Sequence, residues 1–193
     1  HGRYCARSAL QRLGAGAGQI LIGASREPLW PAGITGSISH AGTAAAAVVA
    51  EIAAEGGTAV AVVGDAGDEA VIAEYIRAAN ALAPLGIAIN NAGIGGGLAP
   101  TGSYTDADWD RTIALNITTV FRGLRGQVNA MAATGGSIVN MASMLGVIGS
   151  VGSPAYAATK HAVVGLTKTT ALEYAAAGIR VNAVAPGYVD TAL

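Results

Sequence analysis

"GSIVNMAS" (residues 136–143) and "IRVNAVAPG" (residues 179–187) are the two runs of sequence from which the fold class follows. Each run is short, apolar and rich in β-branched residues, which is typical of a strand buried on both faces. Between them lies "SPAYAATKHAVVGLTKTTALEYAAAG" (residues 153–178), which has the length and composition of a helix. Two such strands joined through a helix predict a right-handed crossover and therefore a parallel sheet.

The same alternation extends toward the N-terminus. Apolar strand runs are expected near residues 58–63 and 86–90, in addition to 136–140 and 179–184. Helices are predicted over 43–57, closed by two glycines, over 68–82, and over 105–133, which begins with a capping residue at Thr105 or Asp106. We therefore expect an α/β fold, a Rossmann-like three-layer parallel sheet with helices on both faces.

The first forty residues break this rhythm. They contain one helical run, a glycine-rich loop and an irregular segment, and none of these repeats later in the chain. We therefore expect an incomplete sheet with an irregular N-terminal segment, and two parts, residues 1–47 and 48–193.

The amino-acid composition indicates which kinds of binding partner the chain is not expected to have. Charged residues make up only 12% of the chain, and the formal net charge is −1, so electrostatic capture of nucleic acid is not expected. Cys5 is the single cysteine, which excludes an intrachain disulfide and favours a reducing, cytoplasmic compartment. Since no apolar run reaches the ~20 residues of a membrane helix, no membrane partner is expected either.

Tyr156 and Lys160 stand four residues apart on a predicted helix, so their side chains share one face. A tyrosine hydroxyl is a useful acid or base near neutral pH only when a nearby ammonium lowers its pKa from about 10. The alternative is an exposed aromatic–lysine pair without a role. Ser143 follows a predicted strand at the carboxyl edge of the sheet, where ligands of open parallel sheets bind, and could donate a hydrogen bond to a substrate oxygen.

Three further segments carry polar or small residues at the same edge. Asn116 lies inside a predicted helix, where asparagine is unfavourable, so it marks either a kink or a functional position. "NNAG" (residues 90–93) and "PGYVDT" (residues 186–191) follow strands and allow a flat cofactor to approach the backbone closely.

Together these motifs resemble the short-chain dehydrogenase/reductase family from about residue 51 to 193. The resemblance implies an NAD(P)-dependent oxidoreductase with Tyr156 as general acid or base and Lys160 lowering the pKa of that hydroxyl and holding the nicotinamide ribose. It implies that Ser143 orients the carbonyl, that Asn116 supports a water of the proton relay, and that Asp65 approaches the adenine. The implied cofactor-lining residues are Asp65, Asn90, Ala92, Gly93, Tyr156, Lys160, Pro186, Gly187, Val189 and Thr191.

"GITGSISHAGT" (residues 33–43) is where that family carries its glycine-rich phosphate loop. Aligned on Thr35 and Gly36, the chain has His40 at the middle glycine and Gly42 at the last, and the distance to Asp65 is too short for the missing strand and helix. Residues 2–50 instead resemble the N-terminal part of phosphopantetheinyl transferases. That resemblance implies that Ser39 and His40 contact coenzyme A.

The leading hypothesis is hydride transfer between NAD or NADP and a small alcohol or carbonyl substrate. The alternatives are a coenzyme A-dependent transferase fragment and a chimeric α/β fragment without catalysis. Because the glycine-rich β-α-β unit is absent, we expect weak or no dinucleotide binding by the chain as it stands. The same loss is expected to expose apolar surface, which favours a homo-oligomer. The sequence predicts no metal site and does not reveal the substrate.

Overall fold

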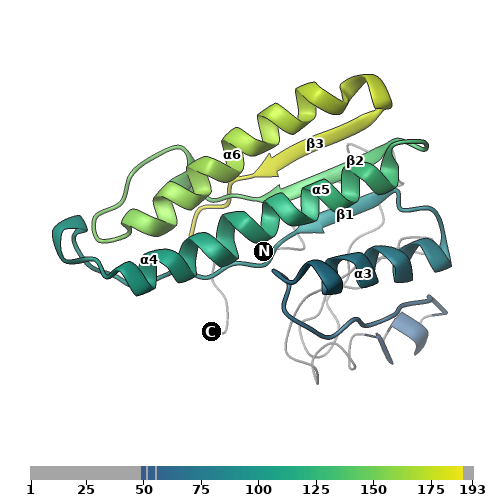
Figure 1. Ribbon diagram of the computed structural model, residues 1–193, viewed down its shortest axis with the longest axis horizontal. Helices are drawn as coiled ribbons and strands as arrows, with labels where there is room; N and C mark the ends of the chain where they lie inside the picture. Colours follow the sequence, from purple (N-terminus) through teal and green to yellow (C-terminus); the bar gives the residue numbers. More distant parts are fainter. Residues whose placement is uncertain (1–48, 51, 55, 189–193) are drawn as a thin grey trace. The chain divides into compact units, whose positions relative to one another are not determined.

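The computed structural model describes residues 49–50, 52–54 and 56–188 (Figure 1). Residues 62–187 form one compact unit, and residues up to 61 and from 188 belong to a second. In the described part of the second unit, residues 49, 50 and 52–54 are helical. The N–H of Gly57 bonds to the carbonyl of Ile52 at 2.9 Å, and Gly56 adopts a φ of 81°, as expected of a glycine at a helix end.

The elements of the larger unit alternate as the sequence predicts. In chain order they are α3 (Glu69–Leu82), β1 (Ile87–Asn90), η1 (Thr101–Ser103), α4 (Asp106–Ile113), η2 (Ala114–Thr118), α5 (Thr119–Met131), β2 (Gly136–Met141), η3 (Met144–Gly146), α6 (Pro154–Tyr174), η4 (Ala175–Ala177) and β3 (Ile179–Val184). No helix in the described part of the chain combines the length and the apolar character needed to cross a membrane.

Three strands form a parallel sheet in the order β1-β2-β3, with Asn90 opposite Asn140 and Val139 opposite Asn182. The predictions of strands near 86–90, 136–140 and 179–184 are therefore confirmed. The prediction for 58–63 is wrong, because the structure has no strand there and leaves Val60 52% and Val63 71% exposed. A strand requires a neighbour for its backbone hydrogen bonds, and apolar β-branched composition alone does not supply one.

The core lies between the sheet and two helices. Val120, Leu124 and Val128 of α5 and Val163 of α6 pack with alternate residues of the strands, among them Ile138 and Val181, in one buried cluster. α3 packs on α5, where a Cβ at Gly126 would lie 2.7 Å from Ile76 Cδ1. Helices were expected on both faces of the sheet, whereas the described helices that pack on it, α5 and α6, share the face of this cluster (Figure 1).

The helix predicted over 105–133 is interrupted. It begins where Thr105 Oγ1 accepts a hydrogen bond from the N–H of Asp108 at 3.1 Å, so Thr105 is the capping residue. Between α4 and α5, residues 114–118 form a π turn, and the N–H of Thr119 reaches back to the carbonyl of Ala114. Such turns interrupt the ladder of an α-helix and often lie at functional sites.

Candidate active site

Ser143 lies directly past the carboxyl end of β2 and is buried. Its Oγ accepts a hydrogen bond from the N–H of Leu145 at 3.2 Å, which starts the short helix η3. The next residue, Met144, donates its N–H to the carbonyl of Pro186 at 2.8 Å and so ties this loop to the segment after β3. Ser143 and Pro186 therefore lie on neighbouring loops at one edge of the sheet, as the sequence predicts.

Tyr156 and Lys160 lie in the first turns of α6, which starts with Pro154, a residue suited to the first helical position. Lys160 is only 5% exposed, so it is not half of a solvated surface pair. Its Nζ donates to the carbonyl of Met141 at 2.7 Å and lies 5.5 Å from the centre of the Tyr156 ring. Because burial disfavours the charged form, the pKa of Lys160 falls from 10.5 to about 8.

Asn116 lies in the π turn and is completely buried. Its Oδ1 accepts from the N–H of Ile94 at 2.8 Å, while its Nδ2 donates to the carbonyl of Ile94 at 2.8 Å and to Thr159 Oγ1 at 3.3 Å. Both amide donors are thereby used. The side chain holds the loop after β1 against α6, at the point where the helix is interrupted.

The loop after β1 approaches the same place. A Cβ at Gly93 would lie 3.1 Å from Asn116 Oδ1 and 3.6 Å from Lys160 Nζ, so the backbone there passes close to both side chains. Ala92 is half-buried beside it. Asn90 points elsewhere: its Nδ2 donates to Asn140 Oδ1 at 2.8 Å, and its Oδ1 accepts from Gln127 Nε2 at 2.8 Å.

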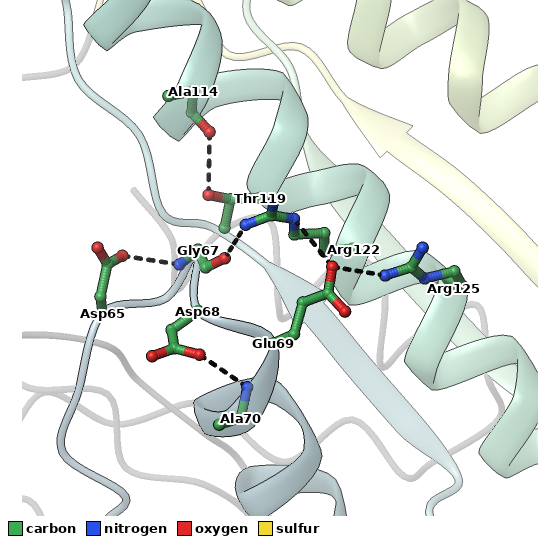
Figure 2. Close-up of polar contacts among 9 residues, drawn as sticks. All are labelled: Asp65, Gly67, Asp68, Glu69, Ala70, Ala114, Thr119, Arg122 and Arg125. Carbon is green, nitrogen blue, oxygen red and sulfur yellow. Dashed lines mark hydrogen bonds and ion pairs between the residues drawn. The ribbon is translucent and has the colours of Figure 1, made fainter.

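Asp65 is exposed in the turn that leads into α3, and its Oδ1 accepts from the N–H of Gly67 at 2.8 Å (Figure 2). The turn is fastened to α5. Arg122 donates to the carbonyl of Gly67, and Arg125 forms an ion pair with Glu69 at 2.9 Å. The structure thus places Asp65 beside the N-terminal half of α5, apart from the hydrogen bonds that join Asn116, Thr159 and Tyr156.

Several of the predicted site residues lie outside the residues that the structure describes. Val189 and Thr191 lie outside the described residues, as do Thr35, Gly36, Ser39, His40 and Gly42, whereas Gly187 is exposed in the loop after β3. Sequence reasoning also missed Thr159 and Arg122. Thr159 precedes a lysine on one helix, and Arg122 lies on another, amphipathic helix. Neither position carries a local signal, because a hydrogen-bond partner of each residue lies far away in the chain. The described residues bring together no group of His, Cys, Asp or Glu that could hold a metal ion.

Comparison with known proteins finds two family matches. Residues 32–193 match the family described as short chain dehydrogenase, and residues 1–50 match the 4'-phosphopantetheinyl transferase N-terminal domain. Both ranges include residues 32–50. The chain belongs to the short chain dehydrogenase family.

Two curated relatives and three solved structures illustrate the likeness. The chain is 44% identical to cyclohexanol dehydrogenase of Acinetobacter sp. (strain SE19) over 78% of its length and 61% of the relative's. It is 42% identical to cis-4-hydroxycyclohexanecarboxylate dehydrogenase of Sinomonas cyclohexanicum over 65% of its length and 51% of the relative's. The chain thus spans between half and two thirds of the length of these relatives.

Among solved structures, a 3-ketoacyl-ACP reductase from Sinorhizobium meliloti 1021 superposes with a TM-score of 0.77 at 36% identity, over 82% of this chain and 64% of that one. NAD+-bound xylitol dehydrogenase gives a TM-score of 0.72 at 33% identity, over 76% and 57%. ElxO with NADP bound gives 0.66 at 34% identity, over 72% and 56%.

Proposed function

We propose that this chain is an oxidoreductase that uses NAD or NADP and transfers hydride between the nicotinamide and an alcohol or carbonyl substrate. The observation that carries the proposal is the buried Lys160 ammonium, 5.5 Å from the ring of Tyr156, at the strand edge that also holds Ser143. A lysine over the ring of a tyrosine, at the sheet edge that also holds a serine, supplies the groups that an acid–base step at a carbonyl oxygen uses.

The steps of this reaction divide among four side chains. In the reduction of a carbonyl, the Tyr156 hydroxyl gives its proton to the carbonyl oxygen, and in the oxidation of an alcohol, the Tyr156 phenolate takes the proton of the alcohol. Ser143 orients that oxygen through a hydrogen bond. Lys160 stabilises the phenolate and can bind a ribose hydroxyl, since Met141 uses one of its three donors. Because both Nδ2 donors of Asn116 are used, a water of the relay would donate to an oxygen of this residue, either Oδ1 or the backbone carbonyl. When bound, the nicotinamide supplies or accepts the hydride.

The groups around Lys160 fit the ribose end of a nicotinamide cofactor. Gly93 and Ala92 bring the backbone past Lys160 with no bulky side chain between them, and Pro186 and Gly187 line the facing loop. Asp65 remains the candidate for the adenine end, and Asn90 contributes through its backbone, since its side chain bonds to Asn140 and Gln127. Val189 and Thr191 complete the proposed set.

For the substrate, we propose an alicyclic alcohol or its ketone. The names of two relatives specify cyclohexanol and a hydroxycyclohexanecarboxylate. The loops beside Ser143 and Tyr156 expose large apolar side chains, Leu98, Val147, Ile148 and Val151. These two loops are joined by the N–H of Ala99, which donates to the carbonyl of Gly152 at 3.0 Å. The apolar ring of such a substrate could pack against these side chains.

We also propose a homo-oligomer in a reducing, cytoplasmic compartment. Trp109 on α4 and Phe121 on α5 are 40% and 47% exposed, and exposed aromatic side chains favour association. Sedimentation velocity tests the oligomer. The division between residues 47 and 48 remains our proposed domain boundary.

The decisive experiment titrates the purified, monodisperse chain with NADH, NADPH and coenzyme A by fluorescence or calorimetry, followed by turnover of cyclohexanol. Binding of NADH or NADPH with turnover supports the proposal. Coenzyme A binding alone favours the transferase fragment, and no binding favours a non-catalytic fragment. A micromolar dissociation constant for a dinucleotide would contradict the expectation of weak binding and would assign the phosphate contacts to residues 1–50, with Thr35, Gly36 and Gly42 as ligands.

A further inference from the structure

Thr159 lies between Tyr156 and Lys160 on α6, and its side chain is completely buried. Its Oγ1 donates to the carbonyl of Tyr156 at 2.8 Å and accepts from Asn116 Nδ2 at 3.3 Å. One hydroxyl therefore connects the turn of α6 that carries Tyr156 with the π turn that carries Asn116.

The connection continues beyond Asn116. The amide of that residue makes two hydrogen bonds of 2.8 Å with the backbone of Ile94, in the loop after β1. Three segments that are distant in the sequence are thus held together by a single line of side-chain hydrogen bonds. Buried lines of this kind, with every member satisfied, make a local structure rigid.

The first turn of α6 has no side-chain cap. Ser153 occupies the N-cap position but makes no side-chain hydrogen bond to the helix, so the first turn lacks the usual cap. Tyr156 lies in this turn. The hydroxyl of Thr159 is therefore well placed to fix the backbone from which the tyrosine projects.

We propose that Thr159 is a positioning residue for the acid–base step, acting through the turn that presents Tyr156 and Lys160. This inference rests on the proposed function. Loss of the hydroxyl would let that turn move relative to Ser143 and to the substrate, and a displacement of about 1 Å at a reacting group can cost up to about a hundredfold in rate.

Thr167 offers a matched control on the same helix. It is also buried, its Oγ1 donates to the carbonyl of Val163 at 2.7 Å, and it accepts from Asn140 Nδ2 at 2.9 Å. The hydrogen-bonding pattern is that of Thr159, about two helical turns farther from Tyr156. A purely structural role for the Thr159 hydroxyl predicts that both threonines behave alike.

The first experiment compares Thr159→Val, Thr159→Ser and Thr167→Val in steady-state oxidation of cyclohexanol. Valine keeps the shape and removes the hydroxyl, and serine keeps the hydroxyl. We expect kcat of Thr159→Val to fall about 10- to 100-fold with KM within about twofold, near-normal kcat for Thr159→Ser, and unchanged kcat for Thr167→Val. Equal losses in the two valine variants, or none in Thr159→Val, would overturn the inference. Thr159→Ala gives the same test if the valine variant does not fold.

A second readout needs neither cofactor nor turnover. The chain has only two lysines, Lys160 and Lys168, so lysine labelled with carbon-13 at Cε gives two resonances. We expect Thr159→Val to move the Lys160 resonance and its titration, and Thr167→Val to leave them in place. A Lys160 resonance that is identical in wild type and Thr159→Val refutes the inference, whereas a wild-type chain without nucleotide binding or turnover refutes the proposed function.

Discussion

Replacing Lys160 with methionine should change the pH dependence of stability in a defined direction. Burial lowers the pKa of Lys160 in the folded protein to about 8, from a value of 10.5 for an unburied lysine. The folded state therefore binds fewer protons than the unfolded state between about pH 8 and pH 10.5. In that window the stability of the wild type rises with pH, and the penalty for burying the ammonium is fully present below pH 8.

The size of the effect follows from the two pKa values. At about 1.4 kcal/mol per pKa unit, the folded ammonium costs about 3 kcal/mol at neutral pH, and less than about 1 kcal/mol of this remains at pH 10. Methionine has no charge and removes the whole penalty. It also removes the 2.7 Å hydrogen bond to the carbonyl of Met141, a loss of about 1–3 kcal/mol that does not depend on pH.

The assay is urea unfolding of wild type, Lys160→Met and Lys168→Met at several pH values from 7 to 10. The free energy of unfolding of Lys160→Met minus that of the wild type should fall by about 2–3 kcal/mol across this range. Lys168 is exposed on the same helix, so its variant controls for the loss of one lysine side chain and should differ from the wild type by less than about 0.5 kcal/mol at pH 7. A difference for Lys160→Met that is constant from pH 7 to 10 would refute the argument.

Three further predictions concern the site and its support. Tyr156→Phe should abolish hydride transfer and leave the unfolding transition unchanged, since only a hydroxyl is lost. Lys160→Met should also lose most of the hydride-transfer activity. Activity of Tyr156→Phe within a few-fold of wild type would contradict the proposed role of Tyr156. Gly96→Ala should lower the free energy of unfolding by about 1–3 kcal/mol in chemical denaturation, because φ is 75° and a Cβ would lie 2.8 Å from Thr112 Oγ1. Gly95→Ala is the control and should leave the free energy of unfolding nearly unchanged, since a Cβ there would have no atom within 4 Å. Gln127→Leu should cost about 1–3 kcal/mol, because the Oδ1 of the partly buried Asn90 loses the hydrogen bond that Gln127 Nε2 donates to it. Equal stability in urea would count against that network.

The Gln127 network shows what local sequence does not reveal. Gln127 joins Asn90 to the hydroxyl of Tyr75, 3.1 Å from its Nε2, and burial raises the pKa of that tyrosine. A polar residue on a helix reads as solvent-facing by itself. Its burial depends on α3 and β1, which come from other parts of the chain, and the pattern of α5 contains no sign of either.

The candidate site was predicted to the extent that it follows from strand ends and helical spacing. Tyr156 and Lys160 share a face because α-helical residues four apart always do, and Ser143 lies at the carboxyl edge of the sheet because it follows the end of a parallel strand. The burial that lowers the pKa of Lys160 depends on the packing around this side chain. Spacing could not decide between that environment and an exposed pair.

The sequence by itself determined the alternation of strands and helices, the parallel sheet and the common helix face of Tyr156 and Lys160, the proposed acid–base pair, because periodicity and spacing act over a few neighbouring residues. Tertiary structure alone decided which apolar runs become strands: residues 58–63 have the right composition but form none. It also decided that the Asn116 amide and the Thr159 hydroxyl would meet, since residues 43 positions apart become neighbours only when α6 packs against the π turn. Hydrogen-bond partners and burial are properties of the packed chain, and a local pattern cannot specify them.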